Sequence, residues 1–235
     1  MRKGYILIAV VASLLLTGCF GPAGYHFDDS PTMLDITLKR TPNGDTIPTN
    51  AKVRIWKTNP EGQIVYSLHR DVTIDPDSQI AKLAVEVPAK SAYRVTAMHA
   101  SQGVFEIGER MINAPREQIT TVTISLTPID VTINAPDKVY SGGSLGQFTV
   151  ALPEEYSHLL EYGIMIGSTP WTENGNEDIL YLDLDEAYLP EVTEAQTLYY
   201  QMVVVAKKGT FTGERPTAYF PDLNEQALPH IAIHP

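Results

Sequence analysis

The stretch that decides the fold is Ile80-Ala81-Lys82-Leu83-Ala84-Val85-Glu86-Val87, because apolar side chains occupy every second position from Ala81 to Val87. A period of two places these side chains on one face of an extended chain, which predicts a β-strand packed on a core. The same alternation occurs in runs before and after this stretch and starts again at residue 129: Leu34-Ile36-Leu38, Tyr93-Val95-Ala97, Val122-Ile124-Leu126 and Ile129-Val131-Ile133.

Turn-forming residues separate the runs, at Pro42-Asn43-Gly44-Asp45, Asn59-Pro60-Glu61-Gly62 and Asp75-Pro76-Asp77-Ser78. Proline, glycine, asparagine and aspartate each favour tight turns for their own stereochemical reason. Many short strands joined by such turns, with no convincing helix between them, favour a sandwich over a sheet of alternating strands and helices. The predicted fold class is therefore all-β.

The length of 235 residues leaves room for one large domain or for two domains of ordinary size. We place the boundary near residue 128, between two alternating runs. The predicted organisation is a signal peptide at 1–18, a lipidated tether at 19–31, a first β-sandwich at 32–128, a second at 129–222, and a last segment at 223–235. That segment either adds an edge strand through Ile231 and Ile233 or trails as a tail, and the sequence leaves both open.

The first 19 residues have the features of a bacterial lipoprotein leader. Two basic residues, Arg2 and Lys3, precede an apolar run from Tyr5 to Leu16. That run is shorter than the roughly 20 residues that span a bilayer, but it suits a signal peptide. The following Leu16-Thr17-Gly18-Cys19 resembles the lipobox of bacterial lipoproteins. The resemblance implies lipidation of Cys19, cleavage before it, and attachment to the cell envelope, with the outer membrane as the expected location.

In the first predicted sandwich, the turn at 75–78 is followed by the strand Ile80–Val87, a short Pro88-Ala89 turn and a strand containing Tyr93. This order resembles the transthyretin-like or carboxypeptidase-regulatory-like domains of secreted bacterial proteins. The resemblance implies a β-sandwich of that kind at the N-terminal side of the mature chain.

In the second predicted sandwich, three segments carry a further resemblance: Glu161–Thr169, Thr197–Ala206 and the glycine-rich Gly209–Glu214. They resemble a fibronectin type III-like repeat of bacterial surface lipoproteins. The resemblance implies a pair of tandem immunoglobulin-like or fibronectin III-like β-sandwiches, with Tyr199 or Tyr200 as the corner tyrosine that fastens the second one. The stretch 153–160 allows a short helical turn in place of a loop.

The charge of the chain argues against a nucleic-acid partner. The formal net charge is −11, and residues 19–235 carry 15 basic and 28 acidic residues. A phosphate backbone would repel such a surface, and no stripe of clustered Lys and Arg offsets it. Cys19 is the only cysteine, so no internal disulfide is expected.

Two patterns suggest catalysis or zinc binding but fail on their context. Gly142-Gly143-Ser144-Leu145-Gly146 matches the hydrolase nucleophile motif, yet a strand-like run follows it where that motif needs a helix. His230 and His234 lie four residues apart, which on a strand separates them by about 13 Å, too far to share one zinc ion. We therefore predict a turn around Ser144 and no enzyme activity.

Oxygen-rich side chains and one tryptophan gather between residues 171 and 186. Calcium could bind oxygen atoms of the 173–178 stretch or of Asp183, Asp185 and Glu186, but a plain acidic loop is the simpler interpretation and no metal is predicted. Trp171 lies in a polar loop, where a tryptophan can stack on a sugar or anchor a protein contact. The simpler interpretation is that its ring covers the end of the core of its own domain. Trp56 lies within an apolar strand and is expected in the core.

Together these patterns predict a non-enzymatic envelope lipoprotein that acts as an interaction or accessory subunit through the loops and edges of its sandwiches. Two alternatives stay open, a carbohydrate-binding surface lipoprotein and a purely structural spacer. The expected partners are the membrane, through the lipid anchor, and a protein or polysaccharide; no cofactor is expected. The candidate contact residues are Trp171, Asn174, Asn176 and Asp178.

Overall fold

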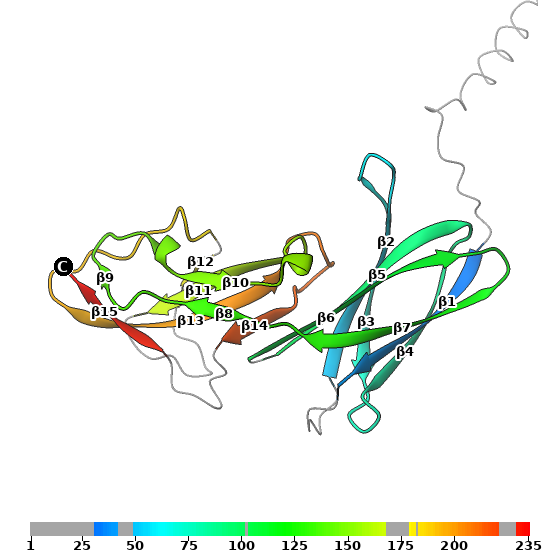
Figure 1. The fold of residues 1–235 in the computed structure, drawn as a ribbon, viewed down its shortest axis with the longest axis horizontal. Coiled ribbons are helices and arrows are strands. Elements are labelled where there is room, and N and C mark those ends of the chain that lie inside the picture. Colours follow the sequence, from blue (N-terminus) through cyan, green and yellow to red (C-terminus); the bar gives the residue numbers. More distant parts are fainter. Residues whose placement is uncertain (1–30, 42–48, 102, 168–178, 182, 221–228) are drawn as a thin grey trace, which may run out of the picture.

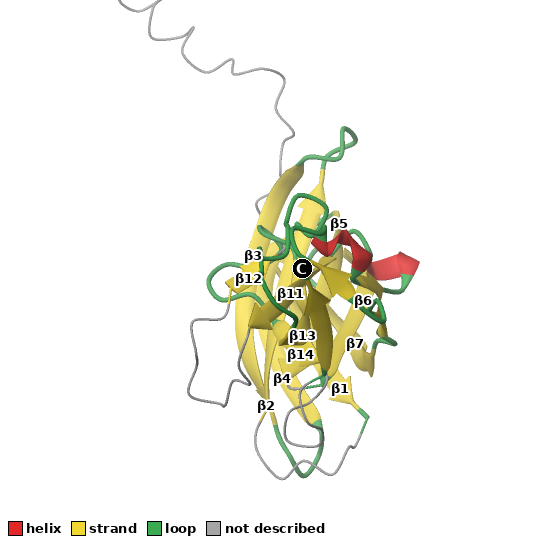
Figure 2. Cartoon of the chain, turned by 90° about the vertical axis from the view of Figure 1, so that its left-hand side faces the viewer, coloured by secondary structure: helices red, strands yellow, loops and turns green. Residues whose placement is uncertain are grey.

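The computed structural model of the chain consists almost entirely of β-strands, in two units that lie end to end (Figure 1). It describes residues 31–41, 49–101, 103–167, 179–181, 183–220 and 229–235. The all-β sandwich prediction is confirmed, and the described helices are two short 3-10 turns (Figure 2). The predicted signal peptide and the tether up to residue 30 lie outside the described residues.

The N-terminal unit is a seven-stranded path in the order β3-β2-β5-β6-β7-β1-β4. β7 pairs with β1 in parallel over most of its length and with β6 only through Glu106↔Pro128 and Ile107↔Thr127. The path therefore bends into a four-stranded layer, β3-β2-β5-β6, and a three-stranded layer, β7-β1-β4. The strands are β1 (Pro31–Arg40), β2 (Thr49–Thr58), β3 (Ile64–Ile74), β4 (Ile80–Pro88), β5 (Ser91–Ser101), β6 (Val104–Ala114) and β7 (Ile119–Pro128).

The core of this unit is made by the side chains that alternate inward from both layers. In β1, Leu34, Ile36 and Leu38 are buried while the residues between them are not, as the period of two predicts. Gly108 lies where β6 closely approaches β7, because a Cβ atom there would be 2.3 Å from the carbonyl oxygen of Ser125. The other strands contribute Ala51, Val53, Ile55, Val85, Val87, Tyr93, Val95, Val122, Ile124 and Leu126.

Two of the predicted turns of this unit lie within the described residues and are confirmed. The Asp75 carboxylate accepts hydrogen bonds from the backbone N–H groups of Asp77 and Ser78 and from the Ser78 hydroxyl. These bonds, chiefly those of Ser78, hold the pKa of Asp75 below its ordinary value. At the second turn, the Gly62 N–H donates to the Asn59 carbonyl at 3.0 Å. Residues 42–45 lie outside the described residues.

The C-terminal unit is organised around the long strand β13, which pairs with β11 on one side and with β14 and β15 on the other. A two-stranded sheet of β8 and β10 accompanies it. The elements are β8 (Thr132–Asn134), β9 (Val139–Tyr140), η1 (Leu145–Gln147), β10 (Thr149–Ala151), η2 (Glu154–Tyr156), β11 (Leu160–Gly167), β12 (Ile179–Tyr181), β13 (Gln196–Ala206), β14 (Thr217–Phe220) and β15 (His230–His234).

Within the last predicted segment, residues His230–His234 form strand β15, which lies inside the sheet path. β15 pairs antiparallel with β13 and in parallel with β9, through Ile233↔Val139. Its alternating residues Ile231 and Ile233 are buried in the C-terminal core. Of the alternatives that the sequence left open, the structure therefore has neither a trailing tail nor an edge strand. The helical turn allowed at 153–160 is present as η2.

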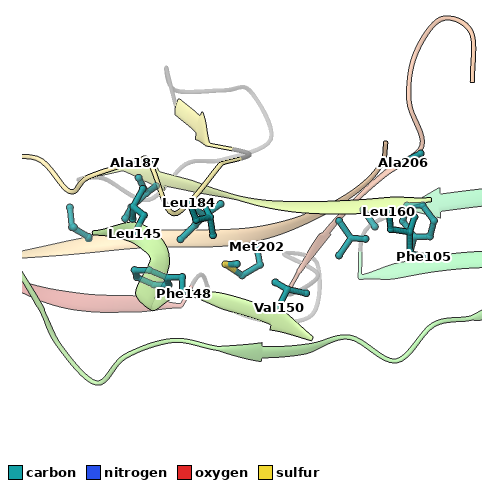
Figure 3. Close-up of a cluster of buried hydrophobic side chains, with 14 of the residues drawn as sticks. Phe105, Leu145, Phe148, Val150, Leu160, Leu184, Ala187, Met202 and Ala206 are labelled. Carbon is teal, nitrogen blue, oxygen red and sulfur yellow. The ribbon is translucent and has the colours of Figure 1, made fainter. Parts of the chain in front are cut away.

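The two units share a core at their junction. Met98 of β5 and Phe105 and Ile107 of β6 belong to the N-terminal strands, yet their side chains are buried in the hydrophobic cluster of the C-terminal unit. Figure 3 shows Phe105 entering that cluster beside Leu160 and Ala206. The Gly103 N–H also donates to the Tyr219 carbonyl of β14 at 2.8 Å. The C-terminal unit therefore packs on one end of the four-stranded layer.

Candidate interaction surface

The residues that the sequence singled out as ligand contacts cannot be placed. Trp171, Asn174, Asn176 and Asp178, and the lipidation site Cys19, lie outside the described residues. They remain predictions.

The acidic residues that follow the predicted contact loop lie on the surface. Asp183, Asp185 and Glu186 are exposed around the buried Leu184. Within the described part of the chain, no group of three or more His, Cys, Asp or Glu side chains could hold a metal ion.

The two rejected motifs have the local structure expected for them. Ser144 caps η1, and its hydroxyl accepts a hydrogen bond from the Gly146 N–H at 3.0 Å, so the motif forms a turn. His230 and His234 lie at the two ends of β15 and contact different rings, those of Tyr199 and Tyr140.

A tyrosine hydroxyl fastens the N-terminal unit, in the manner predicted for the C-terminal one. The buried Tyr93 donates its hydroxyl to the Pro88 carbonyl at 2.7 Å, five residues upstream. Burial raises the pKa of Tyr93 to about 12. Tyr200 packs edge-to-face on Phe148, and neither Tyr199 nor Tyr200 has a hydroxyl hydrogen bond within the described residues. The described residues therefore do not support the prediction of a corner tyrosine in the C-terminal unit.

Trp56 is not a core residue, which corrects the sequence-based expectation. It lies on β2, as predicted, between Ile55, which points into the core, and Lys57. Because neighbouring residues of a strand point to opposite faces, Trp56 points to the outer face of the four-stranded layer. There it is half-buried and belongs to neither hydrophobic cluster.

Two arginines flank the indole ring of Trp56. The guanidinium carbons of Arg54 and Arg94 each lie 5.1 Å from the ring centroid, within cation–π range. Arg94 is the direct cross-strand neighbour of Trp56 on β5, and Arg54 is two residues before it on β2. The sheet register therefore places both cations on the ring.

A hydrogen-bonded network fixes this group of side chains. Trp56 Nε1 donates to the Thr96 hydroxyl at 3.1 Å, and that hydroxyl donates to Glu109 Oε1 at 2.8 Å. The other carboxylate oxygen of Glu109 lies 3.3 Å from an Arg94 amino group. The neighbouring Met111 is 62% exposed. We call this set the tryptophan platform: Arg54, Trp56, Arg94, Thr96, Glu109 and Met111.

The C-terminal unit covers one half of the outer face of the four-stranded layer, and the platform lies on the other half. Of the platform residues, Met111 is exposed, Trp56, Arg94 and Glu109 are half-buried, and Arg54 and Thr96 are buried. Met98 and Ile107 are the next outer-face residues on β5 and β6 after Thr96 and Glu109, and both are fully buried at the junction. On β3, the His69 ring meets the Phe211 ring of the C-terminal unit edge-to-face, with centroids 6.2 Å apart. A groove of about 500 Å³ runs between the units beside this contact.

A hydrogen-bonded chain links Arg54 of the platform to His69 at the junction. Arg54 Nε donates to the Ser67 hydroxyl at 3.1 Å, and that oxygen lies 2.9 Å from His69 Nε2. Burial, and then the charge of Arg54, lower the pKa of His69, and burial lowers that of Arg54. His69 Nδ1 is buried and has no hydrogen-bond partner among the described residues. The junction thus favours a neutral imidazole.

Charge is also divided unequally between the units. Residues 31–128 contain 11 basic and 10 acidic residues, whereas residues 129–235 contain 4 basic and 16 acidic ones. The net acidity of the chain therefore belongs to the C-terminal unit, and the platform lies on the unit that is close to neutral. A partner with negative charge would approach the N-terminal unit more easily than the C-terminal one.

The comparisons with known proteins add little to this description. No protein-family model matches the chain, and no curated protein does either. Among solved structures, the chain is similar to a DUF4876 family protein from Bacteroides thetaiotaomicron VPI-5482, with 13% identity, a TM-score of 0.33, and 80% of this chain and 48% of that chain covered. It thus spans about half the length of that protein.

Two further solved structures show a similar level of likeness. One is the full-length major pilin SpaD from Corynebacterium diphtheriae, with 9% identity, a TM-score of 0.31, and coverage of 84% of this chain and 66% of that chain. The other is the Bacillus anthracis TIE protein, with 11% identity, a TM-score of 0.24, and coverage of 79% and 31%. Among the described residues, no helix is long and apolar enough to cross a membrane.

Proposed function

We propose that this chain is a non-enzymatic, lipid-anchored envelope protein that binds a protein partner through the tryptophan platform. The observation that carries the proposal is the composition of the platform. Trp, Arg and Met are enriched in protein interfaces, and Trp and Arg account for many of the residues that dominate binding energy. Here they share one face of the sheet, held by the network through Thr96 and Glu109.

The platform favours a protein over a polysaccharide. A sugar-binding tryptophan presents a free ring face for stacking, but two guanidinium groups already lie against the Trp56 ring. The two guanidinium groups can instead exchange their contacts with the ring for contacts with carboxylates and backbone carbonyls of a protein partner. A pure spacer would have no use for an exposed Met111 on the same face as a half-buried tryptophan.

The membrane anchor in this proposal depends on Cys19. Replacing Cys19 by alanine should leave an unprocessed precursor without lipid. A trimmed, lipid-labelled form of the Cys19→Ala chain would contradict the anchor but would leave the platform untouched.

The experiment that tests the binding role is a gentle detergent pull-down of the lipidated chain from its own envelope. We expect a stoichiometric protein partner with the wild type and its loss with Trp56→Ala. The matched control is Tyr188→Ala, since Tyr188 is an aromatic residue of the C-terminal unit that is 63% exposed. Equal recovery of the partner with Trp56→Ala would overturn the proposal, provided that its thermal melting shows a folded chain.

A further inference from the structure

The two edge strands of the N-terminal unit, β3 and β4, differ in how well they are protected. β3 and β4 end the seven-stranded path, and within the described residues the outer edge of β3 pairs with no strand beyond the bridge Asp75↔Ile80. β4 carries the protections usual at an edge, with the charged Lys82 and Glu86 and a terminal Pro88. β3 has 11 residues and no charged side chain from Ile64 to Leu68.

The uncharged stretch of β3, residues 64–68, is also exposed and largely apolar. Ile64 is 51% exposed and Val65 is 38% exposed, next to a register shift in the β2–β3 pairing. Tyr66 and Leu68 reach the core of the N-terminal unit but stay half-buried, because no strand covers that flank. The register shift beside Val65 and the charged Arg70 and Asp71 guard the two ends of this stretch, whereas the free backbone groups between them can recruit another strand.

We propose that the β3 edge, over residues 64–68, accepts an extended strand from the partner polypeptide. This inference rests on the proposed function and names the contact that would accompany the platform. A row of alternating backbone donors and acceptors is complementary only to another extended backbone. The added strand would place apolar side chains at alternate positions, over Tyr66 and Leu68.

The placement of this edge agrees with the platform and with the charges. Ser67 of β3 is the cross-strand neighbour of Trp56 and accepts the hydrogen bond from Arg54, so the platform and the edge are continuous. The added strand would lie on the near-neutral unit, away from the 16 acidic residues of the C-terminal one. One partner can therefore contact the platform through side chains and β3 through its backbone.

The test uses the mature lipidated chain in detergent and a synthetic probe. The probe is an end-blocked heptapeptide of alternating threonine and valine, and its control has the same composition with a central proline. We expect the probe to slow backbone amide hydrogen exchange of residues 64–68 at least tenfold. The double variant Ile64→Lys, Val65→Lys should abolish that slowing, and Ile119→Lys, at an isoleucine that is 70% exposed on β7, should retain it.

Each other outcome overturns a defined part of the inference. No slowing at millimolar probe, or equal slowing with the proline peptide, would show that β3 accepts no strand. Protection of residues 64–68 without probe that increases with protein concentration would show that a second copy occupies the edge. The two proposals can also fail separately. If the probe protects residues 64–68 but the Trp56→Ala variant still binds the protein partner, the proposed function is contradicted and the strand addition at β3 is not.

Discussion

Replacing Glu106 by glutamine should destabilise the N-terminal unit by about 3–5 kcal/mol, the range observed when one member of a buried ion pair is removed. The Glu106 carboxylate lies 2.5 Å from Arg40 Nε, and the two side chains are only 2% and 1% exposed. At such burial, water cannot replace the lost carboxylate around the guanidinium charge. The change also affects the junction, because Glu106 lies between Phe105 and Ile107, which pack on the C-terminal core.

Urea unfolding followed by tryptophan fluorescence measures this effect. The chain has two tryptophans, so a Trp171→Phe background leaves Trp56 as the reporter of the N-terminal unit. With a denaturant slope of roughly 1–3 kcal/mol per molar urea, the loss should lower the midpoint by about 1–5 M. The paired replacement Arg40→Met, Glu106→Leu should recover much of the loss, because it removes both buried charges.

The matched control is an ion pair of similar length on the surface. Lys52 Nζ and Asp71 Oδ1 lie 2.9 Å apart, but the Asp71 side chain is 73% exposed. Asp71→Asn should therefore cost at most about 1 kcal/mol. If Glu106→Gln and Asp71→Asn shifted the midpoint equally, the reasoning from burial would be refuted.

Three further predictions concern other contacts. Tyr93→Phe removes the buried hydroxyl bond to the Pro88 carbonyl and should cost about 1–3 kcal/mol in urea unfolding, since it orphans that acceptor; an unchanged midpoint would contradict this. Gly108→Ala should cost more than 3 kcal/mol or prevent folding, because its Cβ would meet a backbone carbonyl at 2.3 Å, and wild-type melting would rule out that close approach. The pKa of His69 is lowered in the folded chain, so the unfolded chain binds a proton at His69 first as the pH falls. The free energy of unfolding should therefore decrease below about pH 6.5. The variant His69→Gln should show a smaller decrease. An unchanged pH slope in His69→Gln would contradict this assignment.

Many strands and turns of the N-terminal unit could be predicted, because the patterns that specify them lie within short stretches of sequence. The alternating stretches Leu34–Leu38 and Ala81–Val87 lie in β1 and β4. The turn that begins at Asp75 joins β3 to β4 and is held by a hydrogen bond to the Asp75 side chain. The same rule, applied strictly, would have placed Trp56 correctly. Val53 and Ile55 define the inward face of β2, so the residue after Ile55 must point outward.

The rest of the fold depends on contacts far apart in the sequence. β15 lies inside the sheet path because it pairs with β9, a strand about 90 residues earlier, and no local pattern of Ile231 and Ile233 specifies that partner. The junction did leave a signal, since β6 begins with the apolar Phe105 and Ile107 on the face opposite its inward residues. Large apolar residues on the outward face of a strand indicate that another part of the molecule covers that face.

The measurement that tests the proposed function most directly is the affinity of the mature chain for its co-purified protein partner, compared among Trp56→Ala, Trp171→Ala and Tyr188→Ala. The tryptophan platform predicts a loss of about 30-fold or more for Trp56→Ala, the equivalent of a binding hot spot of about 2 kcal/mol, and wild-type affinity for Tyr188→Ala. Wild-type affinity in Trp56→Ala together with loss of binding in Trp171→Ala would contradict the platform and return the binding site to the loop predicted from the sequence.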